Sequence, residues 1–190
     1  MNRRDALNRV ALLVGGGIVG GAAFLEGCKT ADKKMAIGLP FTAENISFLD
    51  EVAETIIPTT NTPGAKAAKV GAFMHTMVTD CYDEKDQKIF IDGISSIDEA
   101  CEKLHGHGFM KASPEHRKEV LTTLDKEQKD YNSKKKDGDP NHYFSLMKQL
   151  TLLGYFTSEI GATQALRYIA VPGKYEGCIP YKKGDKAWAT

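Results

Sequence analysis

Apolar residues recur at helical spacing from Thr42 onward, and this period restricts the chain to folds built from packed helices. Leu49 and Val52 share one apolar stripe, which Pro58 ends. Runs that alternate apolar and polar residues, as half-buried strands do, are few. With 190 residues the chain is long enough to bury one hydrophobic core. We therefore predict an all-α bundle of about five helices in residues 42–168.

Cap and turn residues divide this pattern into separate helices. Thr62, followed by proline, can begin a second helix, and Asp83 can cap a third. The glycines of "HGHG", residues 105–108, can close the third helix in a left-handed conformation. Ser113 and Asp139, each followed by proline, predict the starts of the fourth and fifth helices. The core face expected for the third helix comprises Phe90, Ile94, Ile97, Cys101 and Leu104.

The fifth helix, "NHYFSLMKQLTLLGYFTSEIG", is apolar nearly all round. A helix of this kind is either the central helix of a bundle or has a second face that lies against another protein. Both explanations stay open. Tyr155 and Phe156 are the candidate interface residues on this helix.

Residues 169–190 have neither a helical nor an alternating period, so we expect an irregular, extended carboxyl-terminal arm. The arm holds tyrosines, prolines and the only tryptophan, a composition typical of a recognition segment. A tail packed on its own bundle fits equally well. The candidate partner-interface residues are Tyr155, Phe156, Tyr168, Pro172, Gly173, Tyr175, Cys178, Pro180, Tyr181 and Trp188.

The amino terminus has the three-part order of an export signal. Arg3 and Arg4 resemble the pair of a twin-arginine signal, although a general secretory signal also fits. The apolar run that follows is interrupted by glycines and is shorter than the roughly 20 residues that a bilayer span needs. We therefore prefer a cleaved signal over residues 1–27 to an anchoring helix.

The sequence "LEGC" at the end of this run resembles a lipoprotein box, with Cys28 as the lipidated residue. Residues 28–41 then form a polar linker that Gly38 and Pro40 interrupt. The sequence thus predicts an exported, periplasmic protein that a lipid tethers to the membrane.

The remaining cysteines are too few for a disulfide framework. Cys81 and Cys101 lie at opposite ends of neighbouring antiparallel helices, roughly 24 Å apart, so they should not pair. Both are expected on buried apolar faces. Cys178, in an exposed turn, is the candidate for an intersubunit disulfide.

Charge and motifs argue against nucleic-acid binding and against catalysis by this chain. The 25 Lys and Arg residues equal the 25 Asp and Glu residues, so no basic surface for nucleic acid is expected. No nucleophile elbow, Walker loop or dinucleotide fingerprint occurs in a fitting context. His105 and His107 are a weak hint of a metal site. We predict no catalytic, cofactor-binding or metal-binding residues.

Two stretches resemble a known family. They are "DEVAETIIPTTNTPGAKAAKVGAFMHTMVTDCY", residues 50–82, and "LTLLGYFTSEIGATQALRYIAVPGKYEGC", residues 150–178. Together they are similar to the small subunit, called subunit 3, of gluconate 2-dehydrogenase-type membrane complexes. The resemblance covers most of the chain after the signal. Residues 83–140 match it only in length and helical pattern.

This resemblance implies an accessory role. In the family the small subunit has no redox centre. It binds a large FAD-dependent flavoprotein of the glucose-methanol-choline type, and electrons leave through a partner with haem c. The resemblance also implies that one twin-arginine signal can export the folded flavoprotein together with this chain. The sugar or alcohol substrate is left open.

Two alternatives come from other functional classes. One is a free-standing exported helical lipoprotein that acts as a scaffold or binding module. The other is a small metal or haem protein that uses His105 and His107.

Overall fold

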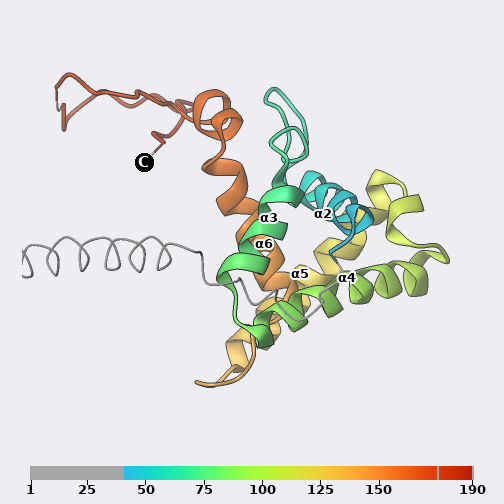
Figure 1. Cartoon of the computed structure of the whole chain (residues 1–190). Helices are drawn as coiled ribbons and strands as arrows, with labels where there is room; N and C mark the ends of the chain where they lie inside the picture. Colours follow the sequence, from blue (N-terminus) through green and yellow to red (C-terminus); the bar gives the residue numbers. More distant parts are fainter. Residues whose placement is uncertain (1–40, 175, 190) are drawn as a thin grey trace, which may run out of the picture. The chain divides into compact units, whose positions relative to one another are not determined.

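The computed structural model describes residues 41–174 and 176–189, and in this part of the chain the prediction of an all-α bundle of about five helices is confirmed (Figure 1). The predicted export signal with Arg3 and Arg4, the lipidation site Cys28 and the interface residue Tyr175 lie outside the described residues. The elements in chain order are α2 (Ala43–Ile56), α3 (Val70–Cys81), α4 (Glu84–His105), the 3-10 helix η1 (Phe109–Lys111), α5 (Pro114–Lys134), α6 (Tyr143–Phe156) and the π-helix η2 (Gly161–Ala165).

Local caps fix three helix ends where the sequence predicted them. The Asp83 carboxylate accepts from the backbone N–H of Asp86 at 2.8 Å and begins α4. The Ser113 hydroxyl accepts from the backbone N–H of His116 at 3.3 Å and begins α5. Gly106 ends α4 with φ 74°, a left-handed conformation that glycine adopts without steric cost.

The predicted start of the second helix was wrong, since α3 begins at Val70 and not next to Thr62. The intervening chain is held in turns by the Glu54 carboxylate of α2. This carboxylate accepts from the backbone N–H of Thr59 at 2.8 Å and from that of Lys66 at 2.9 Å. These bonds satisfy the backbone N–H groups of the loop without a helix, so α3 begins only after the loop, at Val70.

The predicted start of the fifth helix was also displaced. Asp139 accepts from the backbone N–H of Lys136 at 2.9 Å and so closes a turn instead of capping a helix. The cap of α6 is His142, whose Nδ1 accepts from the backbone N–H of Phe144 at 3.2 Å. The side chain of Asp139 is therefore committed to the loop before α6 can begin.

Helix α6 lies at the centre of the bundle, where it contacts α2, α3, α4 and α5. Figure 1 shows it alongside α3. No helix in the described part of the chain is long and apolar enough to cross a membrane. The largest fully buried side chains are Tyr155, Phe90, Phe109, Phe144, Leu49, Met74, Ile97, Met147, Leu150, Val52, Val70 and Val78.

Leu104 was predicted to be in the core but is 53 % exposed. Leu104 therefore lies on the exposed side of the last turn of α4, whereas Cys101 in the same turn is buried, and Phe109 of η1 contributes a further buried side chain. The Phe109 ring packs 5.2 Å from that of Phe48, measured between centroids. This short element is too brief to show a helical period, so Phe109 was not predicted as a core residue.

A glycine brings α2 and α3 close together. The backbone N–H of Gly71 donates to Asp50 Oδ1 at 2.8 Å. Burial of Asp50 raises the pKa of its carboxyl group, and the Gly71 hydrogen bond only partly opposes this effect. A Cβ atom on Gly71 would lie 2.5 Å from the backbone oxygen of Ile46, closer than carbon and oxygen can pack.

An arginine joins the α4–α5 corner to α2. Arg117 on α5 donates to the carbonyl oxygens of Phe109 at 3.0 Å and Met110 at 2.9 Å, and its guanidinium also pairs with Glu51 on α2. Glu51 pairs with Lys66 as well. Lys66 and, to a smaller extent, Arg117 lower the pKa of the Glu51 carboxyl group. The ion pair between Arg117 and Glu51 keeps both side chains charged, although both are partly buried.

We predict that Gly71→Ala lowers the free energy of unfolding by about 1–3 kcal/mol, because the added methyl group must push α2 and α3 apart. This loss of stability is expected even though alanine favours helices more than glycine does. Equilibrium urea unfolding followed by circular dichroism measures it. Gly173→Ala, where a Cβ atom would meet nothing within 4 Å, is the control and should unfold like the wild type.

Candidate partner interface

Helix α6 is both central and incompletely covered. Leu152, Leu153 and Phe156 are 41 %, 43 % and 40 % exposed, although the same helix contacts all the other long helices. The two explanations for its apolar composition therefore apply together to different faces. Large apolar side chains grouped on a surface are typical of a protein interaction site. We name the surface of these three residues the α6 face.

Tyr155 was predicted as an interface residue, and its burial corrects that prediction. Its side chain is 1 % exposed, and its hydroxyl donates to the carbonyl oxygen of Pro63 at 2.7 Å. The ring of Phe156 meets it edge-on with centroids 5.2 Å apart. Tyr155 therefore belongs to the core, where it supports the neighbouring residue of the α6 face.

The end of the carboxyl-terminal segment pairs with Arg167, where the segment begins. The backbone N–H of Arg167 donates to the carbonyl of Ala187 at 2.8 Å, and the N–H of Ala189 donates to the carbonyl of Arg167 at 2.7 Å. The guanidinium of Arg167 lies over the Trp188 ring, 4.4 Å from its centroid. These contacts form a clasp of backbone bonds and a cation–π interaction. We name residues 167–189 the tail loop.

The predicted arm is irregular between Leu166 and Ala189, with the Arg167–Trp188 bridge as the only strand-like pairing at the residues described there. The sequence left open whether this arm is extended or packed on the bundle. The structure adds that residues 187–189, near its end, pair with Arg167, just before its start. Apolar and aromatic side chains remain exposed on it, including Val171 at 82 % and Tyr181 at 77 %. The predicted interface residues that are exposed here are Tyr168, Pro172, Gly173, Cys178, Pro180, Tyr181 and Trp188.

The tail loop carries positive charge and two surface hollows beside Trp188. Lysines and Arg167 outnumber the two acidic residues, Glu176 and Asp185. The hollows, of about 460 and 370 Å³, are both lined by Glu176, Ile179 and Trp188. Hollows beside an aromatic residue can accept anchoring side chains of a partner. The loop thus suits a partner surface that combines apolar anchors with acidic groups.

The three cysteines in the described residues are free, so Cys81 and Cys101 do not pair with each other. Cys101 is buried, and burial raises the pKa of its thiol. Cys81 was expected to be buried but is exposed at the end of α3. Cys178 is exposed in the tail loop, and its disulfide with another subunit stays a prediction.

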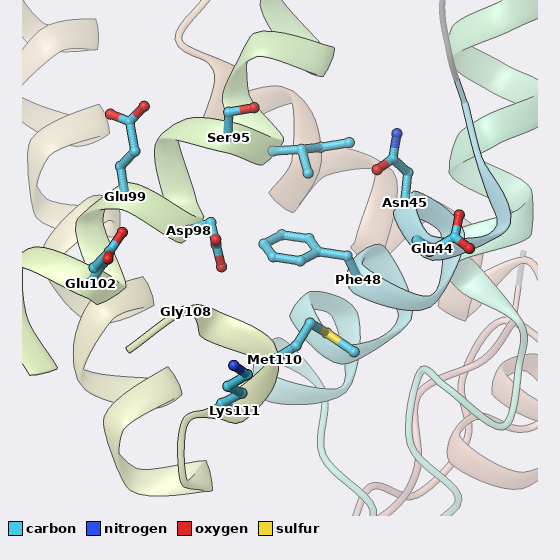
Figure 2. A pocket seen from close by; sticks show the side chains of 11 residues that line it. Glu44, Asn45, Phe48, Ser95, Asp98, Glu99, Glu102, Gly108, Met110 and Lys111 are labelled. Atoms are coloured by element: carbon cyan, nitrogen blue, oxygen red, sulfur yellow. The ribbon is translucent and has the colours of Figure 1, made fainter. Parts of the chain in front are cut away.

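A cleft of about 580 Å³ lies between α2, α4 and η1. Figure 2 shows Phe48 and Met110 reaching into it, with Asp98 on the α4 side. Asp98 is already engaged, because its Oδ1 accepts from the backbone N–H of Phe109 at 2.7 Å. The carboxylates of Glu44, Glu99 and Glu102 also line the cleft, together with Ser95 and Lys111. The residues that line it include no histidine and no cysteine.

The sequence paired His105 only with His107, and the structure adds His116. Their three rings stack at the corner between α4 and α5. The proximity of His116 depends on how the corner folds, since it lies in the first turn of the next helix. Among the described residues, no group of three or more His, Cys, Asp or Glu side chains is placed so that it could hold a metal ion.

Comparison with known families identifies the family of this chain. The model of gluconate 2-dehydrogenase subunit 3 matches residues 43–173, more than half of the chain. The chain belongs to this family. Comparisons with curated proteins and with solved structures give no match. The predicted family resemblance is therefore confirmed, and the chain is an accessory-type subunit of the gluconate 2-dehydrogenase subunit 3 family.

The match to subunit 3 includes every α-helix from α2 to α6 and the first part of the tail loop. The α6 face lies within it, as do Pro172 and Gly173. Tyr181 and Trp188 lie beyond it, so the part of the loop that closes the clasp is outside the family match.

We predict that Trp188→Ala opens the tail loop without unfolding the bundle. The cation–π contact contributes roughly 0.5–1 kcal/mol at an exposed site, so its loss should raise the open population several-fold. Trypsin should then cleave after Lys182 or Lys183 faster than in the wild type, with an unchanged melting temperature. Val171→Ala, an exposed change outside the clasp, is the control, and equal cleavage of all three proteins would contradict the prediction.

Proposed function

We propose that this chain is the non-catalytic small subunit of an exported FAD-dependent sugar dehydrogenase complex, and that it binds and stabilises the large flavoprotein subunit. The α6 face is the single observation that carries the proposal. It presents Leu152, Leu153 and Phe156 to solvent from the central helix of a family named as a subunit. Large exposed side chains on a rigid helix are suited to a stable protein interface, since little ordering is needed on binding.

The tail loop supports the same proposal as a second contact. Its clasp reduces the conformational freedom that binding would otherwise remove. Tyr168, Tyr181 and Trp188 are aromatic residues of the type that dominates binding energy at interfaces. Cys178, exposed on the same loop, could strengthen the contact through a disulfide in an oxidising compartment.

In this proposal the chemistry belongs to the partners. The large subunit, of the glucose-methanol-choline type, holds FAD and oxidises the sugar or alcohol, and a c-type cytochrome takes the electrons. This chain contributes binding surface.

The proposal includes export and attachment to the membrane. Arg3 and Arg4 would direct the chain, with its folded flavoprotein partner, through the twin-arginine route. Cys28 would then carry a lipid that holds the complex at the periplasmic side of a membrane. A partner that acquires FAD before transport must cross folded, which explains why this route and a tight interface occur together.

We predict that Leu153→Lys weakens binding of the large subunit by about 2 kcal/mol, or roughly 30-fold in Kd, because a charge replaces an apolar contact of the α6 face. Stability of the isolated chain should change by less than about 0.5 kcal/mol, since Leu153 is exposed. The measurement is co-purification of the full-length chain with the co-expressed flavoprotein, followed by flavin absorbance.

Leu104→Lys is the matched control for this experiment. Leu104 is an exposed leucine on a different helix, near the end of α4 and outside the α6 face, so its replacement should leave the flavin yield unchanged. If both variants retain the flavoprotein equally, the α6 face is not the interface. If the wild-type chain is purified colourless and alone, the alternative of a free-standing lipoprotein scaffold is favoured instead.

We also predict that replacing both Arg3 and Arg4 with lysine retains this chain and the flavoprotein in the cytoplasm, because the twin-arginine route requires the arginine pair. Cell fractionation with immunoblots of both subunits measures the result. Arg9→Lys, in the same basic segment, is the control. Normal export of the flavoprotein from the double variant would refute the shared signal while leaving the interface proposal intact.

A further inference from the structure

Arg167 is a charged side chain without a partner of opposite charge in the part of the chain that the structure describes. Its guanidinium lies over the Trp188 ring, and none of the ion pairs among the described residues includes it. Its Nε is buried and has no hydrogen-bond acceptor. An arginine nitrogen that is withdrawn from water without an acceptor costs free energy, so it requires an explanation. The terminal nitrogens Nη1 and Nη2 are not buried, so a group from another molecule can reach them.

The two acidic residues of the tail loop have other partners. Glu176, which lines the same hollow as Arg167, pairs through Oε1 with Lys174 at 2.6 Å. Oδ2 of Asp185 accepts from the backbone N–H of Lys182 at 3.0 Å and closes a turn. Since Arg167 and four lysines outnumber these two acidic residues, the loop keeps a positive charge that an acidic group of a partner can complement.

The hollow that Arg167 lines combines one cation with an apolar wall. It has a volume of about 460 Å³, and Ile179, Pro180, Tyr181 and Trp188 line it as well. Apolar side chains around a charged group exclude water from a hydrogen bond that forms there and so strengthen it. The planar guanidinium can donate two parallel hydrogen bonds to one carboxylate. The hollow therefore suits an acidic side chain that enters from a partner.

Binding of this kind needs no rearrangement of the tail loop. The backbone of Arg167 is held by hydrogen bonds to Ala187 and Ala189, and its guanidinium is held 4.4 Å from the centroid of the Trp188 ring. The side chain is thus fixed at both ends before a partner arrives. Because little conformational freedom remains to be lost, a carboxylate gains most of the energy of the contact.

We propose that Arg167 binds an aspartate or glutamate side chain of the large flavoprotein subunit, which inserts into the hollow beside Trp188. This inference rests on the proposed function, since it names one contact of this chain with that subunit. A protein carboxylate fits the hollow better than an anionic lipid surface does. Lipid-binding segments cluster about four to eight basic residues, whereas Arg167 is the only cation that lines this hollow.

The test measures association of the full-length chain with the purified flavoprotein by surface plasmon resonance. Arg167→Gln should weaken binding at least about tenfold, mainly through faster dissociation, because loss of a desolvated charge pair acts on the dissociation rate. Arg167→Lys keeps the charge without the planar fork and should retain part of the affinity. Lys85→Gln, which removes an exposed lysine of α4, is the matched control and should bind like the wild type.

The dependence of affinity on salt separates loss of the carboxylate contact from opening of the tail loop. An ion pair is screened by salt, so the affinity of Arg167→Gln should fall less from low to high NaCl than that of the wild type. Trp188→Ala opens the loop but keeps the guanidinium, so its affinity should remain as sensitive to salt as that of the wild type. Trypsin cleavage of each free chain reports whether its loop is closed.

Trp188 provides a direct probe of the hollow that needs no variant. It is the only tryptophan, so the full-length chain labelled with 5-fluorotryptophan gives a single ¹⁹F signal from this position. Saturating flavoprotein should shift that signal in the wild type. Vesicles of phosphatidylglycerol should not shift it.

The proposal is overturned if Arg167→Gln binds the flavoprotein as tightly as the wild type or with the same dependence on salt. It is also overturned if the ¹⁹F signal does not shift with the flavoprotein, or if phosphatidylglycerol vesicles shift it instead, which would assign the hollow to anionic lipid. In these cases Leu153→Lys still weakens binding, and the proposed function stands. If the wild-type chain binds no flavoprotein at all, the proposed function fails and this inference fails with it.

Discussion

The fold depends on one constraint, which is that α6 is apolar on nearly every side and must therefore be covered on nearly every side. Helices α2 to α5 cover most of it, and Tyr155 and Leu150 are almost fully buried. The α6 face is the part that the described chain does not cover. Because α6 is fixed by contacts with all its neighbours, the exposed side chains are held on a rigid support. The element that organises the core is thus also the one best able to bind a partner.

Features that depend on neighbouring residues were predictable from the sequence, and those that depend on distant ones were not. The caps at Asp83 and Ser113 act over three residues, and the structure has them where the pattern placed them. The start of α3 was misplaced because Glu54, a residue of the preceding helix, holds the intervening backbone in turns. Leu104 was misassigned because the 3.6-residue period does not show which side of the last turn of α4 the other elements cover, and Leu104 lies on the exposed side.

The candidate interface was likewise predictable only where neighbouring residues determine it. The composition of the tail and of α6 indicated a recognition surface, and Phe156 is exposed as expected. Tyr155, its neighbour, is buried because its hydroxyl reaches a carbonyl in the loop before α3, a contact that no local pattern encodes. The clasp between Arg167 and Trp188 likewise joins residues far apart in the sequence. Sequence composition therefore identifies the kind of surface, whereas tertiary contacts decide which side chains form it.

The clasp changes what the tail can contribute to binding. A free segment of this length would lose much conformational entropy when it is ordered by a partner, and the loss would cancel part of the contact energy. The paired backbone of Arg167 with Ala187 and Ala189 removes some of that freedom before any encounter. In the proposed complex, the partner must be bound before it crosses the membrane, so an interface that needs little ordering is an advantage. A rigid α6 face and a closed tail loop meet this requirement in two different ways, one through burial in the core and the other through closure of the chain on itself.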